Sequence, residues 1–290
     1  MIWLVLSVLG LSIGSFVNAL VWRLHMNEIM AGKLQKKNDK LWNNIFRLKS
    51  NNSYSILNGR SKCPDCRHKL AAADLVPVLS WILLRGKCRY CGKSISWQYP
   101  LVELLVMSLF LLSYLLWPMG FSTVGLFSFG LWLVFLTAFV ALGVYDLKWF
   151  LLPDRIVYPL IGIAIIEVII KATVFGGGWS VITQAFLGVV FISGLFSLIF
   201  IASKGRWIGL GDVKLAVVLG LLVGGPLRSL LLIFIASTLG SVLAIPMLIR
   251  GQAKMTSQIP FGPFLLASTI IVVIFGNNIT DWYNNFVLLR

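Results

Sequence analysis

Eight stretches of the chain are almost entirely apolar, and polar or glycine-rich breaks separate them. Several approach 20 residues, which is the length that an α-helix needs to cross a bilayer and which a soluble core does not require. The pattern predicts an all-α polytopic membrane protein with about eight transmembrane helices. The expected spans are residues 2–22, 100–117, 123–145, 156–174, 179–202, 213–224, 227–249 and 260–276.

Two of these spans have alternatives. Residues 213–224 form the shortest span and end at Gly224-Gly225-Pro226, so they fit equally a broken or re-entrant unit shared with residues 227–249. Residues 2–22 follow no basic side chain and contain no small-residue cleavage site. We therefore expect this span to be a retained helix rather than a removed signal peptide.

Composition agrees with a membrane protein, because 58% of the 290 residues are hydrophobic and only 12% are charged. The net charge of +15 is uneven: residues 23–97 contain 15 Lys and Arg against four acids. Such a segment suits either nucleic acid or the cytoplasmic side of a membrane. In a membrane protein the positive-inside rule explains it without a further assumption, so we expect no nucleic-acid partner and a position near anionic lipid headgroups.

The basic residues also predict the orientation. If the amino terminus lies outside, 22 of the 25 Lys and Arg fall in cytoplasmic segments, whereas the opposite orientation would place the whole basic loop outside. The cytoplasmic segments in this arrangement are residues 23–99, 146–155, 203–214 and 250–259.

All four cysteines lie in the basic loop, as two CxxC pairs separated by 21 residues. This spacing suits four thiolates around one structural zinc ion, in a small zinc-ribbon-like domain. Disulfides and free thiols are the alternatives, although a cytosolic location disfavours disulfides. His68 is a rival ligand, but four cysteines already fill a tetrahedral site, so we interpret it as a surface residue. The predicted ligands are Cys63, Cys66, Cys88 and Cys91.

Two acids stand at the cytoplasmic ends of predicted helices. Asp146 closes the third span, and Asp212 follows Gly209-Leu210-Gly211 at the start of the sixth. Carboxylates held close together at one depth cannot both ionise easily, so they share a proton. An ionised member then activates water while a protonated member donates to a carbonyl, which is the requirement for aspartyl proteolysis.

The same two acids also suit roles other than proteolysis. An acid at a helix end is often a cap or a partner of a nearby Lys or Arg, and a proton-coupled transporter would use the same two acids. Asp154 is a rival of Asp146, although its place after Pro153 suits an amino-terminal helix cap. Glu167 and Lys171 are spaced to pair across one helical turn.

Seven short motifs follow one another along nearly the whole chain, and their order and spacing are more specific than any one of them. They are GSFVN (14–18), RSKCPDC (60–66), LRGKCRYC (84–91), YPLVEL (99–104), the stretch 146–154 that ends in Leu-Pro-Asp, GLGDVKL (209–215) and IPFGPF (259–264). In this combination the chain resembles the bacterial prepilin peptidases. These are the bifunctional leader peptidase/N-methyltransferases of type IV pilus, competence and type II secretion systems.

The resemblance implies that Asp146 and Asp212 are the catalytic pair. It implies prepilin and pseudopilin substrates with a short basic leader, cut after a glycine at the cytoplasmic edge of the inner membrane. The new amino terminus would then be methylated from S-adenosylmethionine, and the cysteine loop is the part that bifunctional members carry. Two features depart from the family pattern: His25 stands where a proline is common, and residues 26–60 match no family motif.

We accordingly expect three parts. Residues 1–22 form the first transmembrane helix, residues 23–99 form the cysteine loop of the methyltransferase part, and residues 100–290 form the peptidase core. A basic leader would be repelled by the basic loop, so we also expect it to dock on acids. The candidates are Asp65, Asp74 and Glu103.

Overall fold

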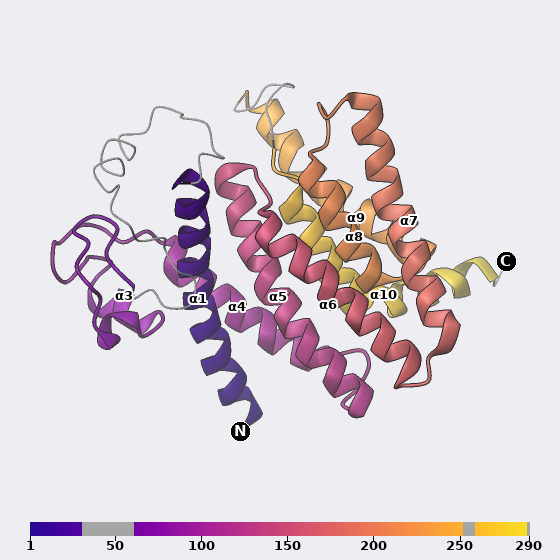
Figure 1. Cartoon of the computed structure of the whole chain (residues 1–290), viewed down its shortest axis with the longest axis horizontal. Helices are drawn as coiled ribbons and strands as arrows, with labels where there is room; N and C mark the ends of the chain where they lie inside the picture. Colours follow the sequence, from indigo (N-terminus) through magenta and orange to yellow (C-terminus); the bar gives the residue numbers. More distant parts are fainter. Residues whose placement is uncertain (31–60, 252–258, 289–290) are drawn as a thin grey trace. The chain divides into compact units, whose positions relative to one another are not determined.

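A computed structural model describes residues 1–30, 61–251 and 259–288 (Figure 1). Over these ranges the regular structure is helical, and the β-structure is limited to two isolated bridges, Lys62–Lys69 and Lys87–Ser94. Most of the unmatched stretch 26–60 and most of the segment 250–259 lie outside the described residues. The prediction of an all-α fold is confirmed.

Seven of the described helices are long and apolar enough to cross a membrane, and each coincides with one of the expected spans. Hydropathy therefore located the membrane-crossing part of the chain correctly. These helices are α1 (Ile2–Met30), α4 (Gln98–Leu115), α5 (Thr123–Trp149), α6 (Asp154–Thr173), α7 (Gly178–Ser203), α9 (Pro226–Ile249) and α10 (Gly262–Leu288).

The remaining expected span, the sixth along the chain, is shorter than a bilayer crossing. It is α8 (Leu210–Val223), whose 14 residues rise about 21 Å against a hydrocarbon thickness of about 30 Å. Gly224 and Gly225 both have positive φ, 64° and 70°, and Pro226 begins α9 at once, so the turn fixes the end of α8. A separate α9 follows, so residues 213–249 form a short helix, a glycine turn and a long helix.

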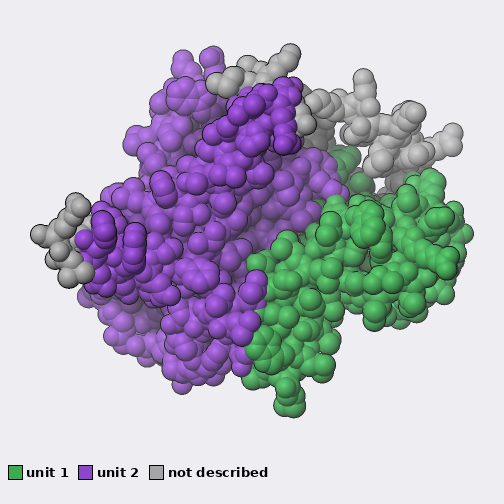
Figure 2. Space-filling view, turned by 180° about the vertical axis from the view of Figure 1, so that it is seen from behind, with its two compact units in different colours: residues 1–111 green, residues 112–290 purple. Residues whose placement is uncertain are grey.

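The chain divides into two compact units, Met1–Leu111 and Leu112–Arg290 (Figure 2). The first unit holds α1, most of α4, a 3-10 turn η1 (Ala72–Leu75) and the short helix α3 (Leu79–Leu83). A Cβ atom on Gly10 or Gly14 would meet backbone atoms of α4 at 2.6 Å, so α1 and α4 pack backbone to backbone.

The second unit is a helix bundle in which α8 occupies the interior. It packs along α7 and also contacts α6, α9 and α10, and its side chains Leu215, Val218 and Leu219 are fully buried. A Cβ atom on Gly188 of α7 would lie 2.3 Å from the carbonyl oxygen of Gly220 in α8. The two helices therefore touch through their backbones along this line.

Candidate active site and metal centre

Asp146 lies in the last turn of α5 and is only 6% exposed. The helix ends four residues later at Phe150, which has φ 55° and donates its N–H to the Asp146 carbonyl oxygen at 2.8 Å. A left-handed residue terminates a helix in this way by satisfying its last carbonyls. The chain thus leaves α5 directly after the acid, and the carboxylate sits at the edge of the bundle.

Gly262, the first residue of α10, lies against that carboxylate. A Cβ atom at this position would come within 2.5 Å of the Asp146 Oδ2 atom, so only glycine leaves room for it. The Gly262 N–H lies within hydrogen-bonding reach of the same carboxylate. The amino-terminal end of α10 therefore supports the acid with a backbone donor.

Asp212 is the third residue of α8, after the N-cap Gly209. Its own N–H donates to the Gly209 carbonyl oxygen at 3.1 Å, and the Gly209 N–H lies within reach of its carboxylate. Only the Asp212 side chain takes part in this capping, because the N-cap residue is glycine and has no side chain to return a hydrogen bond. Asp212 is thus held in orientation by the first turn of α8, from a position inside the helix rather than at its N-cap.

The two acids are brought together by the fold. The charge of Asp212 acts on Asp146 across the space between them. Leu152 lies close to the glycines beside both acids. A Cβ atom added to Gly211 would be 3.1 Å from the Leu152 Cβ, and one added to Gly262 would be 3.7 Å from the Leu152 Cδ2. Helices α5, α8 and α10 and residue 152 therefore converge on one small site.

Asp154 is engaged elsewhere. It accepts a hydrogen bond from the Lys214 ammonium group at 2.8 Å, and that ammonium also lies 5.1 Å from the centre of the Tyr158 ring. The prediction that Asp154 is a helix cap is wrong, because Pro153 occupies the N-cap and Asp154 is the first residue inside α6. Instead it ties α6 to α8, two residues beyond Asp212.

The predicted pairing of Glu167 with Lys171 is confirmed. Glu167 and Lys171 form an ion pair of 2.6 Å across one turn of α6, and the Glu167 side chain is 8% exposed. The pair keeps a buried carboxylate neutralised within the helix.

In the first unit the four cysteine sulfurs form one cluster. All four sulfurs lie within 4.8 Å of one another, and those of Cys63 and Cys91 are 3.9 Å apart. Cys63 and Cys88 are buried, whereas Cys66 is exposed. The two CxxC pairs, distant by 21 residues in the sequence, therefore supply a single four-sulfur site.

Each CxxC pair adopts the same backbone turn. The N–H of the residue after the second cysteine donates to the carbonyl of the first, Arg67 to Cys63 at 3.0 Å and Gly92 to Cys88 at 2.9 Å. Both Arg67 and Gly92 have positive φ, 60° and 70°. Gly92 makes this tight turn without strain, and Arg67 makes the same turn without glycine's freedom.

The donor set suits zinc. Backbone N–H groups, first that of Tyr90, lower the pKa of Cys88 to about 7, although burial opposes them. The pKa of Cys91 instead rises to about 12: the Lys93 N–H favours its thiolate, but burial and the neighbouring thiols outweigh that donor. Four thiolates this close therefore need a cation among them, and four sulfur ligands are what structural zinc prefers.

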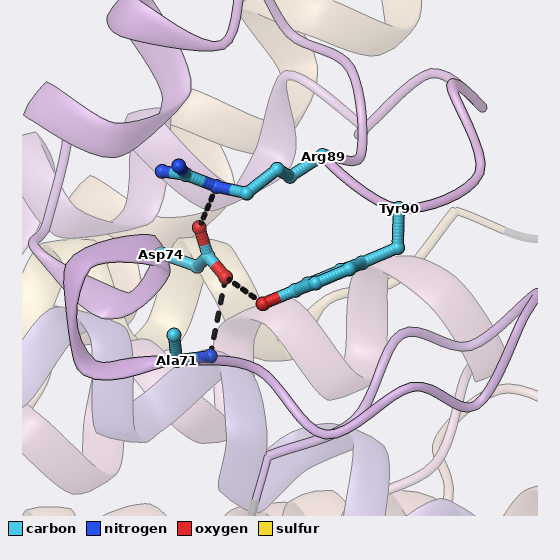
Figure 3. A network of polar contacts seen from close by, with 4 residues as sticks. All are labelled: Ala71, Asp74, Arg89 and Tyr90. Carbon is cyan, nitrogen blue, oxygen red and sulfur yellow. Dashed lines mark hydrogen bonds and ion pairs between the residues drawn. The ribbon is translucent and has the colours of Figure 1, made fainter.

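A polar network braces the second cysteine turn (Figure 3). Asp74 accepts hydrogen bonds from the Ala71 N–H at 3.1 Å, the Arg89 Nε at 2.7 Å and the Tyr90 hydroxyl at 3.0 Å. Burial alone would raise the pKa of Asp74, but these three donors hold it below its usual value. The Tyr90 ring also stacks on that of His68, with ring centroids 3.7 Å apart, and His68 is exposed, which confirms its interpretation as a surface residue.

The acids expected to dock a leader already have partners in their own unit. Asp65 pairs with Lys93 at 2.7 Å, and only 3% of the Asp74 side chain is exposed. Glu103 is buried and accepts the Val78 N–H at 2.7 Å. These contacts give the three acids structural roles, and the docking hypothesis gains nothing from them.

Comparison with known proteins identifies the family. The model of the bacterial peptidase A24 N-terminal domain matches residues 8–117, and the model of the type IV leader peptidase family matches residues 133–245. The chain is 32% identical to the prepilin leader peptidase/N-methyltransferase of Stutzerimonas stutzeri, over 97% of this chain and 93% of that protein. The chain belongs to the type IV leader peptidase family.

Other members of the type IV leader peptidase family match over similar lengths. The prepilin leader peptidase/N-methyltransferases of Dickeya chrysanthemi and Aeromonas hydrophila are 33% and 30% identical. The alignments cover 92% and 98% of this chain, and 90% and 96% of those proteins. No solved structure matches the chain. The resemblance drawn from the short motifs is therefore confirmed by relatives that share nearly its whole length.

Sequence reasoning missed the part that Gly262 and Leu152 play beside the acids. Gly262 lies beyond the stretch that the type IV leader peptidase model matches, although the motif IPFGPF at residues 259–264 contains it. A glycine between prolines signals a restricted backbone, but it does not say what fills the space beside it. Only the fold places it, 116 residues further along the chain, against Asp146.

Proposed function

We propose that this member of the type IV leader peptidase family removes the leader peptide from prepilins and pseudopilins and then N-methylates the new amino terminus. The observation that carries the peptidase half is the pair Asp146 and Asp212, held together by three helices at one edge of the bundle. The methyltransferase half rests on relatives that are named for both activities and align over nearly the whole chain.

In the proposed cleavage step the two carboxylates share one proton. The ionised member takes a proton from water, and the water oxygen attacks the scissile carbonyl carbon. The protonated member donates to the carbonyl oxygen, so that a tetrahedral intermediate forms; its breakdown requires a proton to reach the leaving amide nitrogen. The Gly262 N–H and the first turn of α8 hold the carboxylates in place, which preorganises the pair before substrate arrives.

A helical peptide bond is shielded from such attack, so the substrate must be unwound at the cut. The glycines that flank the site suit this requirement, because Gly209, Gly211 and Gly262 place no side chain between the acids and an extended strand. We expect the substrate backbone to pass along this glycine-lined edge.

In the first unit Cys63, Cys66, Cys88 and Cys91 would hold a structural zinc ion. When bound, the ion would supply folding free energy to a loop with few buried apolar side chains. A four-thiolate site is closed to further ligands, so no chemistry is assigned to it. S-adenosylmethionine would be the methyl donor; residues 23–99 would form the methyltransferase part and residues 100–290 the peptidase core.

The protein is a multi-pass membrane protein, and we place it in the bacterial inner membrane with its amino terminus outside. The basic loop and the ends of α5 and α8 that bear the acids would then face the cytosol. The rival transporter function, which the same acids would suit, finds no support among the relatives.

The test is incubation of the purified full chain with a prepilin in lipid, followed by mass spectrometry of the new amino terminus. Loss of the leader reports the peptidase, and an added CH2 reports methylation when S-adenosylmethionine is present. Asp146→Asn and Asp212→Asn should each abolish the first signal. Proton-coupled transport without any processing of a prepilin would overturn the proposal.

A further inference from the structure

The cysteine-bearing segment, residues 61–97, carries several large apolar side chains that are exposed. Within residues 75–83, which include α3, the side chains of Leu79, Ile82 and Leu83 are 59%, 57% and 81% exposed. Trp97 adds a further ring that is 66% exposed. Exposed apolar side chains gathered on one short helix mark a surface that lipid or a partner covers.

This surface is fastened to the start of a transmembrane helix. The Val78 N–H donates to the Glu103 Oε2 atom of α4 at 2.7 Å, and Glu103 is only 6% exposed. Val78 has φ 58°, a strained conformation for a β-branched residue that persists only where its surroundings enforce it. The hydrogen bond to Glu103 provides that enforcement.

A second link holds α3 to the residues just before α4. The indole N–H of Trp81 donates to the Ile95 carbonyl at 3.2 Å, and its ring lies 4.1 Å from that of Trp97. Helix α4 begins at Gln98, immediately after Trp97. The exposed apolar side chains of α3 are therefore held next to the amino-terminal end of the transmembrane helix α4.

The depth of this attachment can be read from α4. Glu103 lies five residues inside the helix, which corresponds to about 8 Å along its axis. Leu101 and Leu105 of the same helix are 60% and 47% exposed, as lipid-facing side chains of a span are. Helix α3 is thus hydrogen-bonded at the level where headgroups meet acyl chains rather than in open water.

The charges beside the patch select the covering surface. Residues 61–97 contain seven Lys and Arg against two acids, and Arg85 and Lys87 follow α3 directly. Apolar side chains flanked by basic ones suit the interface of a bilayer that contains anionic lipid. The same positive charge disfavours a basic peptide as the occupant.

We propose that residues 75–83 together with Trp97 form a membrane-docking surface, inserted into the headgroup region of an anionic leaflet. The surface lays the cysteine-bearing segment against the bilayer, and the Glu103 contact sets the depth. Arg85 and Lys87 bind the lipid phosphates at the rim. This role needs neither the aspartate pair nor either enzyme activity.

The test uses the full chain in vesicles of phosphatidylcholine with phosphatidylglycerol. A genetically encoded spin label, which spares the cysteines, is placed at Leu83, with Ile82 as a second site. The matched control is Lys69, an exposed residue in the same unit. The label at Leu83 should collide severalfold more often with oxygen, relative to an aqueous nickel complex, than the label at Lys69.

Equal access of the nickel complex to Leu83 and Lys69 would overturn the proposal. The proposal would also be overturned if the label at Leu83 were protected from both oxygen and the nickel complex and its spectrum showed dipolar broadening at a high protein-to-lipid ratio. A second copy of the chain would then cover this face. The charge part is tested with R85Q/K87Q. The label should lie deeper in anionic than in pure phosphatidylcholine vesicles, and the variant should remove that difference; a difference that survives would refute the role of the two charges.

Discussion

The cysteine cluster and the aspartate pair are assembled over different distances along the chain. The cysteine site draws on residues 63–91, and each half is closed by hydrogen bonds inside a six-residue turn. The aspartate site needs α5, α8 and the start of α10, so its parts span residues 146–262. The first is a local structure, whereas the second exists only when the bundle is packed.

The largest expected effect separates the two sites by chemistry. Asp146→Asn or Asp212→Asn should lower the rate of prepilin cleavage by about a thousandfold or more, because either change removes the shared proton. Zinc content and the methylation of a pre-cleaved substrate should stay unchanged. Cleavage rates from mass spectrometry and metal analysis of the same samples check both statements.

The matched control for these variants is Asp154→Asn. Asp154 lies only eight residues after Asp146 in the sequence. It is half-exposed and pairs with Lys214, and exposed ion pairs contribute little to the free energy of folding. Cleavage by this variant should stay within a few-fold of wild type. A thousandfold loss here would instead make Asp154 the functional acid.

The next effect concerns the metal. Cys63→Ser should abolish zinc binding and unfold residues 61–97, since the site draws its stability from all four thiolates. Hydrogen exchange should show lost protection in this segment and unchanged protection in α7 and α8. His68→Ala, which removes a stacking partner but no ligand, should retain the zinc; loss of zinc in that variant would contradict the four-cysteine assignment.

A smaller effect tests how tightly the bundle builds the aspartate site. Gly262→Ala places a methyl group 2.5 Å from Asp146 Oδ2, so the carboxylate must move and cleavage should fall about a hundredfold. Gly143→Ala is the control on α5, because its new methyl group meets Leu266 at an ordinary 3.7 Å. Equal rates for the two variants would show that Gly262 does not position the acid.

The smallest effect distinguishes the two cysteine turns from each other. Arg67→Gly relieves a left-handed residue and should tighten zinc binding by about 1 kcal/mol, or about fivefold in the dissociation constant. Gly92→Ala introduces the same strain and should weaken binding by a similar amount. Chelator competition measures both, and shifts in the same direction would mean that the turns are not equivalent.

The same contrast explains what the sequence alone predicted. The grouping of the four cysteines and the seven spans are encoded locally, in spacing and in apolar runs; the structure gathers the four sulfurs at one place and forms the seven long helices, while zinc at that place stays a prediction. Helix ends were less accurate: α10 continues as far as Leu288, because a helix needs hydrogen bonds rather than hydrophobicity to extend.

Contacts between distant segments escaped prediction. The Asp74 network joins residues 15 positions apart and depends on the folded cysteine turn, and Gly262 acquires its partner only when α10 packs on α5. For the aspartates, topology placed both at one face of the membrane, and only the motif resemblance favoured Asp146 over Asp154. The Lys214 contact now gives Asp154 a structural task of its own.

The backbone contact between Gly188 and Gly220 also bears on the aspartate site. No side chain separates α7 from α8 at this point, so α8, which carries Asp212, is packed directly on the α7 backbone. Asp146 and Gly262 belong to other helices. The spacing of the two carboxylates therefore depends on the packing of α10 against α5 and α8.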